Sequence, residues 1–328
     1  MNLPSAEARW REALESGLTD FLSSYPASSS DGLYAPIHYL LSLGGKRIRP
    51  VLALAACEAE GGLVEEALPA AMAVELFHNF TLMHDDIMDQ APKRRGQDTV
   101  HIKWNENAGI LSGDAMYTLA HVALSELDSR VLPEALKMFN QTALEVCLGQ
   151  QSDMAFESRT DVAVEAYLEM IRLKTSVLVA ASLAMGAIAV GASPQRVKIW
   201  YELGEHLGMA FQMQDDLLDA FGDEAMGKQI GGDILADKKT FLRLYTWQNG
   251  GAAARDVFTR WDGKRGNSNE KINEVRSAMK AAGAEEAAKN EMAAHVGRAM
   301  ACAQKLELAE PHMEWFEFLA GLVTDRTS

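Results

Sequence analysis

Two apolar stretches with the same aspartate pattern decide the fold class of this chain. Residues 73–89 read AVELFHNFTLMHDDIMD, and residues 201–221 read YELGEHLGMAFQMQDDLLDAF. Both combine apolar residues at helical spacing with good helix formers, which predicts a helix in each case. Each stretch contains the pattern D-D-x-x-D, at 85–89 in the first and at 215–219 in the second.

The spacing of these aspartates predicts a bound cation. Residues four apart on a helix lie on one face, about 6 Å apart along the axis, so Asp85 and Asp89 point the same way. Like charges placed so repel, and the negative end of the helix dipole adds to the cost. Carboxylate oxygens, together with water and phosphate, suit Mg²⁺. The two clusters therefore indicate a site that grips a diphosphate through magnesium.

Composition narrows the class of protein. The chain has 328 residues, 48% of them hydrophobic, which is enough for a sizeable core. The net charge of −15 argues against generic nucleic-acid binding. We expect no stable membrane insertion, because no long uncharged apolar run occurs, and no signal peptide. Three widely spaced cysteines show no metal-ligand pattern, and a reducing, cytoplasmic location is expected.

The rest of the chain also favours helices. We predict an all-α protein with one domain over residues 1–328, whose helices surround a deep central cavity with the two aspartate clusters facing each other across its mouth. Gly and Pro breaks are short, and none is long enough for a domain linker. The polar region from Gly251 to Glu285 is expected to be an exposed loop between late helices.

Basic motifs accompany the aspartates. Residues 44–50 read GGKRIRP, and Lys93-Arg94-Arg95-Gly96 follows the first cluster. Arginine offers a fork that fits phosphate oxygens, and lysine offers a compact point charge. Basic residues beside paired carboxylates therefore predict anion contacts next to metal sites.

Taken in order, these motifs resemble those of the trans-isoprenyl (polyprenyl) diphosphate synthases. The resemblance covers most of the chain, and its ordered motifs are GGKRIRP at 44–50, HNFTLMHDDIMD at 78–89, RRG at 94–96, GDAM at 113–116, GQQSD at 149–153, KT at 174–175, FQMQDDLLD at 211–219, GK at 227–228 and DILADKKT at 233–240.

The resemblance implies a reaction and its cofactor. An allylic diphosphate ionises, isopentenyl diphosphate attacks the cation, and loss of a proton leaves a chain five carbons longer. Mg²⁺, as three ions, would neutralise the charge on the leaving group. The cavity must exclude water, which would capture the cation. The resemblance also implies a homodimer.

It further implies roles for single residues. Asp85, Asp89 and Asp215 match metal ligands, and Asp86, Asp216 and Asp219 match outer partners of the metals. The isopentenyl diphosphate site would consist of Lys46, Arg49, His78 and Arg95. The allylic diphosphate and its metals would be contacted by Arg94, Lys174, Thr175, Gln212, Lys228 and Lys238. Lys228 belongs to the GK pair at 227–228, whose spacing from the second cluster varies in the family.

The sequence argues against four other interpretations. A single aspartate cluster is usually a solvated helix face, but two clusters with ordered basic motifs are not explained that way. A terpene cyclase is disfavoured, because the second cluster is intact and Lys46, Arg49 and Arg95 are present. A non-catalytic synthase subunit is disfavoured, because both clusters are intact. A di-iron bundle would need a second E-x-x-H pair besides Glu75 and His78, and the sequence contains none. His84 is expected to be structural.

Product length is expected to depend on residues just before Asp85. Thr81, four residues earlier, lies on nearly the same helical stripe, whereas Phe80 is turned away by roughly 140°. In the family, however, both positions line the tunnel. An aromatic residue at the fifth position with a small one at the fourth resembles the type that makes geranylgeranyl diphosphate. The alternative product is farnesyl diphosphate.

Overall fold

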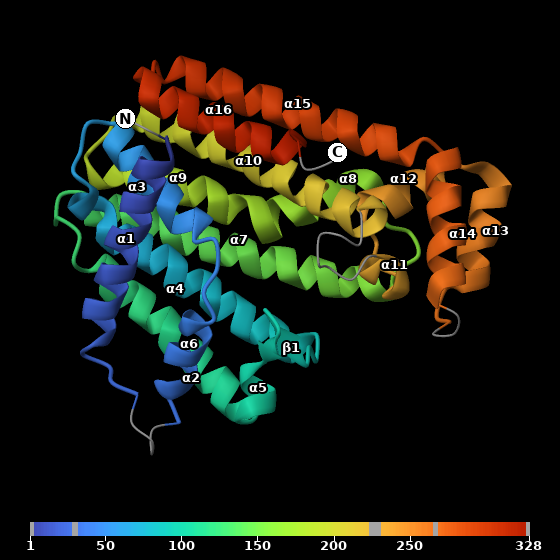
Figure 1. The fold of residues 1–328 in the computed structure, drawn as a ribbon, viewed down its shortest axis with the longest axis horizontal. Coiled ribbons are helices and arrows are strands. Elements are labelled where there is room, and N and C mark those ends of the chain that lie inside the picture. Colours follow the sequence, from blue (N-terminus) through green and yellow to red (C-terminus); the bar gives the residue numbers. More distant parts are fainter. Residues whose placement is uncertain (1–2, 28–31, 223–230, 265–267, 326–328) are drawn as a thin grey trace. The chain divides into compact units, whose positions relative to one another are not determined.

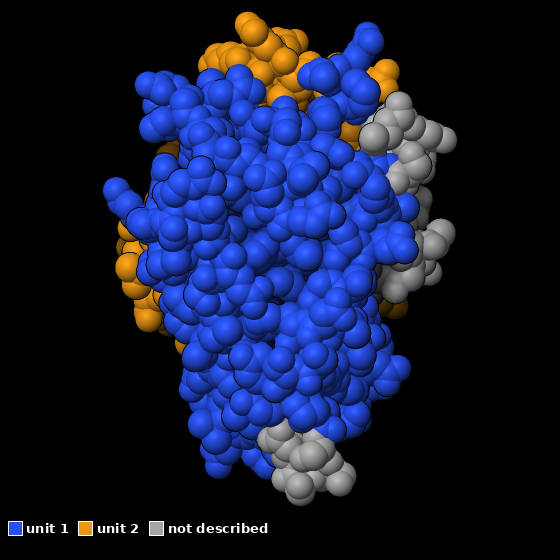
Figure 2. Space-filling model, turned by 90° about the vertical axis from the view of Figure 1, so that its left-hand side faces the viewer, with its two compact units in different colours: residues 1–140, 181–201, 309–312 blue, residues 141–180, 202–308, 313–328 orange. Residues whose placement is uncertain are grey.

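The protein is all-α, as the sequence predicts. A computed structural model describes residues 3–27, 32–222, 231–264 and 268–325 (Figure 1). In the described residues, helices follow one another with short connections, and one two-stranded hairpin interrupts them. The chain divides into two compact units. Unit 1 contains residues 1–140, 181–201 and 309–312, and unit 2 contains residues 141–180, 202–308 and 313–328 (Figure 2).

Unit 1 is built around α4. Its whole elements are α1 (Leu3–Leu22), α2 (Ala35–Ser42), α3 (Ile48–Ala59), α4 (Val64–Met88), β1 (Lys93–Arg94), β2 (Gln97–Asp98), α5 (Val100–Lys103) and α6 (Glu106–Leu124). Helix α4 packs against α3 on one side and α6 on another. Glycine also permits a close approach of α9 (Val177–Ala189) to α3, because a Cβ on Gly186 would lie 2.0 Å from the Ala53 carbonyl oxygen.

The hairpin after α4 has a two-residue turn. Arg94 pairs with Gln97 in antiparallel register, and Arg95 and Gly96 between them have φ values of 53° and 79°. Positive φ at both central positions is the geometry of a type I′ turn, whose twist matches that of the strands. The turn therefore fixes Arg94 and Arg95 a few residues beyond the first aspartate cluster.

Unit 2 contains the later elements. Whole within it are α8 (Val164–Ile171), the π-helix η1 (Arg172–Ser176), α11 (Gly232–Leu235), α12 (Phe241–Asn249), α13 (Gly251–Trp261), α14 (Ser268–Ala281) and α15 (Ala284–Lys305). Four helices have residues in both units, namely α7 (Leu132–Ser158), α9 (Val177–Ala189), α10 (Pro194–Phe221) and α16 (Glu310–Asp325). The core of unit 2 combines Tyr167, Met213, Phe241 and Phe258 with other buried side chains.

The prediction of an exposed loop between Gly251 and Glu285 is wrong. The described part of this region forms α13, α14 and the start of α15. Ala254, Phe258 and Trp261 are buried at spacings of four and three, which is the apolar stripe of an amphipathic helix. Charged residues on the opposite faces dominate the composition and conceal that stripe.

Among the residues that the structure describes, one segment has the length and hydropathy that a membrane span requires. It runs from Val164 to Ala189 and includes α8, η1 and α9, and 78% of its most apolar window is buried inside the protein. Such burial is what a core helix of a folded protein shows, and the segment includes Arg172 and Lys174.

Candidate active site

The first aspartate cluster occupies the last turn of α4. The helix ends at Met88, and the Asp89 N–H still donates to the Asp85 carbonyl at 2.8 Å. The helical spacing predicted for these two residues is therefore present. Asp89 is exposed, whereas Asp85 is partly buried.

Asp86, between them, faces the protein. Its carboxylate is buried and accepts two hydrogen bonds from Arg94, from Nε and from Nη2, each at 2.8 Å. This bidentate pair joins the hairpin to the end of α4. Arg94, predicted to contact the allylic diphosphate, has two of its nitrogens on Asp86.

Two arginines from other elements, Arg49 of α3 and Arg95 of the hairpin turn, lie near His78 of α4, about two turns before Asp85. Arg49 Nη1 lies 3.3 Å from Nε2 of His78. Burial lowers the pKa of His78 well below its usual value, and Arg49, Arg95 and Arg94 lower it further. His78 is therefore neutral at pH 7, and its ring can accept a hydrogen bond from Arg49.

We call the guanidinium groups of Arg49 and Arg95, together with the neutral ring of His78, the cation cluster. Burial also lowers the pKa of Arg49 and of Arg95. The Arg49 Nε is buried without a hydrogen-bond partner among the described residues. Gly45 has a φ of 145°, which favours glycine, and a Cβ there would lie 2.8 Å from Nη2 of Arg95, so the loop passes close to that guanidinium. Crowded positive charge with an unsatisfied donor is an environment that an anion would stabilise.

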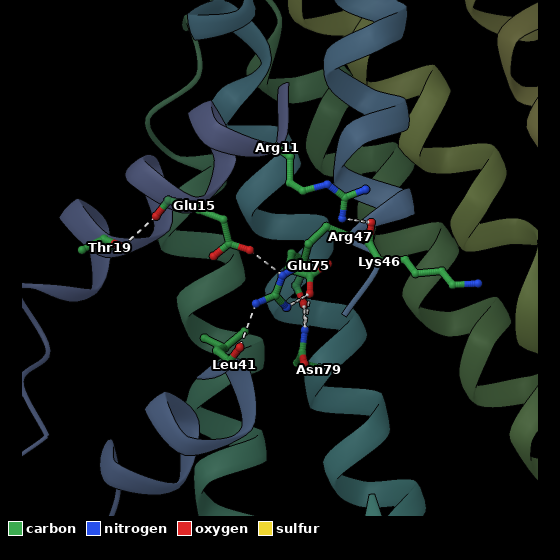
Figure 3. A network of polar contacts seen from close by, with 8 residues as sticks. All are labelled: Arg11, Glu15, Thr19, Leu41, Lys46, Arg47, Glu75 and Asn79. Carbon is green, nitrogen blue, oxygen red and sulfur yellow. Dashed lines mark hydrogen bonds and ion pairs between the residues drawn. The ribbon is translucent and has the colours of Figure 1, made fainter. Parts of the chain in front are cut away.

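The GGKR loop, residues 44–47 before α3, contains Lys46, the fourth residue predicted for the isopentenyl diphosphate site. Lys46 is exposed, and Figure 3 shows its side chain extending away from that of Arg47. Arg47 is buried and pairs with Glu15 and Glu75. Of these adjacent basic residues, Arg49 belongs to the cation cluster, and Arg47 faces the interior of unit 1.

The second aspartate cluster lies near the end of α10. Asp215 is exposed, and Asp216 is buried. The Tyr167 hydroxyl and Gln212 Nε2 donate to the Asp216 carboxylate, the latter at 3.2 Å. Burial raises the pKa of Asp216 to about 7, against these hydrogen bonds, which lower it. Asp219 accepts from the backbone N–H groups of Gly232 and Asp233 at 3.1 and 3.0 Å.

Lys174 and Thr175 lie in the π-helical turn η1. Such turns are rare and are frequently found at functional sites. The Lys174 ammonium donates to Asp153 at 2.6 Å, and the Thr175 hydroxyl donates to Gln212 at 3.1 Å. Thr175, Gln212, Asp216 and Tyr167 thus form one continuous chain of hydrogen bonds in unit 2.

Two further predicted residues lie beyond α10. Lys238 is exposed, with its ammonium 3.6 Å from Asp233. It follows Asp237, which has a left-handed φ of 56°. Lys228 lies outside the described residues.

The two predicted chain-length residues lie one turn before Asp85. The Phe80 ring packs against Phe77, Tyr117 and His84, with centroids 5.6, 5.3 and 4.7 Å away. The Thr81 hydroxyl donates to the His78 carbonyl at 2.8 Å. His84 also touches Gly113, where a Cβ would lie 2.3 Å from its Nε2, so the ring packs tightly in unit 1.

Sequence reasoning did not identify four residues that support these sites. Glu75, Tyr167, Asp153 and Asp233 each contact a predicted residue or its neighbour. Glu75 could have been identified from the sequence, because it is the sole charged residue in the apolar run between Glu66 and His78. Tyr167 could not have been identified in this way, because a tyrosine on an apolar helix face usually belongs to the core.

The donors present suit a metal that retains water. No three His, Cys, Asp or Glu side chains within the described ranges converge tightly enough to hold a metal by themselves. Asp85, Asp89 and Asp215 offer carboxylate oxygens, partly or fully exposed to solvent. Mg²⁺ is usually bound through one or two carboxylates, with waters and substrate phosphates as its other ligands. The residues therefore fit Mg²⁺ bound together with a diphosphate.

Comparison with known proteins agrees with this chemistry. The family model described as polyprenyl synthetase matches residues 30–279. A geranylgeranyl diphosphate synthase of Methanosarcina mazei is 43% identical over 229 residues, 69% of this chain and 70% of that protein. A (2E,6E)-farnesyl diphosphate synthase of Mycobacterium tuberculosis is 36% identical over 287 residues, 86% of this chain and 80% of that protein.

A solved structure extends the likeness to the whole chain. A crystal structure of a geranylgeranyl pyrophosphate synthase superposes with a TM-score of 0.91 at 40% identity, covering 100% of both chains. Helical fold, paired aspartate clusters, family match and relatives all agree: this chain belongs to the polyprenyl synthetase family of prenyl-transferring enzymes.

Proposed function

We propose that the protein condenses isopentenyl diphosphate head to tail with an allylic diphosphate and releases a short-chain trans-prenyl diphosphate. The observation that carries this is the arrangement of α4. His78 and Asp85 are seven residues apart, which is about two turns, so they lie on one side of the helix about 10 Å apart along its axis. One helix thus presents an anion site and a metal-binding carboxylate to the same space.

Different residues would bind the two substrates and the metal. Lys46 and the cation cluster would hold the diphosphate of isopentenyl diphosphate. Lys238 and the π-turn residues Lys174 and Thr175, with Arg94, Gln212 and Lys228, would hold the allylic diphosphate. Mg²⁺ bound by Asp85, Asp89 and Asp215 would act as a Lewis acid on the leaving diphosphate.

The bonds change in a balanced sequence. The allylic C–O bond breaks, and its electron pair leaves with the diphosphate. The double bond of isopentenyl diphosphate supplies the pair for the new C–C bond, and transfer of a proton to the released diphosphate restores a double bond. Lysine and arginine groups fixed beside the leaving oxygens would stabilise the charge that develops there.

The favoured product is geranylgeranyl diphosphate. The residue pair Phe80 and Thr81 supports it, because Phe80 is the bulky member and Thr81 is small. The likeness to geranylgeranyl diphosphate synthases at 43% and 40% identity supports it as well. Farnesyl diphosphate is the second candidate, since a named farnesyl diphosphate synthase is also a relative.

The proposal includes a homodimer in the cytoplasm. Helix α6 exposes Ile110, Leu111 and Val122, with 43%, 59% and 36% of their surface accessible. Apolar residues gathered on one helix are typical of a surface that a partner covers. Sedimentation over a wide concentration range would test this, and a monomer throughout would contradict it.

The reaction is tested with purified protein, Mg²⁺, isopentenyl diphosphate and dimethylallyl, geranyl or farnesyl diphosphate. Product length is read by chromatography, and activity should vanish with a chelator and return with Mg²⁺. Asp85→Ala or Asp215→Ala should each lower kcat by about 10²–10³-fold, the usual loss for one contact at a developing charge. Asp128→Ala, at an exposed aspartate paired locally with Arg130, is the control. Absence of any prenyl product from the unaltered protein would refute the proposal.

The division of the basic residues is tested separately. Arg49→Ala should mainly raise the KM for isopentenyl diphosphate, and Lys238→Ala should mainly impair use of the allylic substrate. Equal effects of both substitutions on both substrates would show that the residues are divided wrongly.

A further inference from the structure

Arg47 has an unusual environment for a residue in a basic motif. It lies between α2 and α3, where its φ and ψ of 49° and 31° are left-handed. Its side chain is only 4% exposed. A buried charge and a left-handed non-glycine residue each cost free energy, so surrounding contacts must hold Arg47 there.

Those contacts occupy all three nitrogens of the guanidinium (Figure 3). Nε donates to Glu15 at 2.9 Å, Nη1 donates to Glu75 at 2.5 Å, and Nη2 donates to the Leu41 carbonyl at 2.7 Å. Asn79 Nδ2 donates to the same Glu75 oxygen at 2.7 Å. Arg47 therefore joins α1, the end of α2 and the middle of α4.

The neighbours of Arg47 in sequence are residues of the proposed isopentenyl diphosphate site. Lys46 precedes it, and the Lys46 carbonyl accepts from Arg11 of α1 at 2.5 Å. Arg49 follows in the first turn of α3, with its guanidinium beside His78. The backbone between the two cationic side chains is thus fixed at one point, the left-handed residue Arg47.

Glu75 connects this network to the cation cluster. It lies three residues before His78 on α4, and it raises the pKa of Arg47, Arg49 and Arg95 against the effect of burial. Its carboxylate is 3% exposed and points to Arg47. Negative charge thus lies behind the cluster, and the buried Arg49 Nε has no hydrogen-bond partner among the described residues.

We propose that Arg47 is a positioning residue: its pair with Glu75 holds the GGKR loop so that Lys46 and Arg49 meet the same diphosphate. Arg47 itself makes no contact with substrate, because its nitrogens are taken by protein acceptors. This inference rests on the proposed function, and it adds a role for two residues outside the predicted site.

Two variants test the proposal in the full-length protein. Arg47→Lys keeps a positive charge for Glu75 but lacks the fork that reaches Glu15 and Leu41. The double variant R47M/E75M removes both charges together, which avoids leaving one buried charge unpaired. In both, the KM for isopentenyl diphosphate should rise by about 10- to 100-fold, since displacement of a binding group by about 1 Å costs up to ~10²-fold. The KM for the allylic substrate should change by less than about twofold.

Glu60→Gln is the matched control. Glu60 caps the other end of α3 and accepts from Arg196 Nε at 2.7 Å and from Trp200 at 2.6 Å. Its loss should lower Tm as a broken buried pair does, without raising the KM for isopentenyl diphosphate. A positioning role predicts this separation, and a general loss of stability does not.

The outcomes are distinct. A selective rise in the KM for isopentenyl diphosphate in R47K, absent in E60Q, supports the proposal even if the double variant does not fold. The proposal is overturned if R47K retains the KM of the unaltered protein, or if both KM values rise together. An unaltered protein that makes no prenyl product would refute the proposed function instead.

Discussion

Gly149 offers a sharp test of how packing positions the π-turn η1. It lies on α7, and a Cβ built on it would lie 2.3 Å from the Lys174 backbone nitrogen and 2.6 Å from the Lys174 Cα. The third contact is the Leu173 carbonyl carbon at 2.7 Å. All three are backbone atoms, so no side-chain rotation can relieve a clash.

The size of the effect of Gly149→Ala follows from these distances. Ordinary contact begins near 3.4 Å, so α7 and η1 would have to separate by about 1 Å. Overpacking of this kind costs about 1–3 kcal/mol, and each kcal/mol lowers Tm by about 2–4 °C in large domains. The same shift would displace Lys174 from Asp153 and Thr175 from Gln212. We expect kcat/KM for the allylic substrate to fall by up to ~10²-fold.

Gly297→Ala is the control for this substitution. Gly297 lies within α15, and a Cβ there would meet no atom within 4 Å. Alanine should stabilise that helix by about 0.5–1 kcal/mol and leave activity unchanged. Thermal unfolding and steady-state kinetics on both variants provide the comparison. If Gly149→Ala matches the unaltered protein in Tm and in kcat/KM, the packing argument for η1 is wrong.

Three other predictions concern separate parts of the chain. Burial, together with the neighbouring His206 and Arg298, lowers the pKa of His295 to about 4. The protein should therefore keep its full stability above pH 6.5 and lose about 1–3 kcal/mol of its unfolding free energy as the pH falls toward 4. Urea unfolding at several pH values should show this loss, His295→Gln should abolish most of it, and an equal loss in that variant would contradict the assignment. Lys271 is 1% exposed and donates to Asp237 at 2.7 Å. Lys271→Met should cost about 1.5–3 kcal/mol, because Asp237 loses its closest cation but keeps Arg243 at 3.7 Å and the Gly263 N–H at 2.9 Å. An unchanged Tm would contradict this. Phe80→Ala should lengthen the prenyl product and Thr81→Phe should shorten it; an unchanged chromatogram for both would place the tunnel floor elsewhere.

The sequence by itself determined the fold class and the family. Helical spacing is a local property, so the apolar stripes and the four-residue separation of Asp85 and Asp89 could be read without tertiary information. Ordered motifs along the chain then specified the family. The same local reasoning failed between Gly251 and Glu285, where charged faces outnumber the buried stripe of Ala254, Phe258 and Trp261.

Tertiary structure alone shows which partners each of several neighbouring charged residues contacts. Arg47 and Arg49 are two residues apart in one basic motif, yet Arg47 is saturated by Glu15 and Glu75, and Arg49 lies beside His78. Asp86 likewise differs from Asp85 because Arg94 of the hairpin reaches it. The partners come from distant parts of the sequence, and the free energy of a charged group depends on its partners and burial, which a motif does not encode.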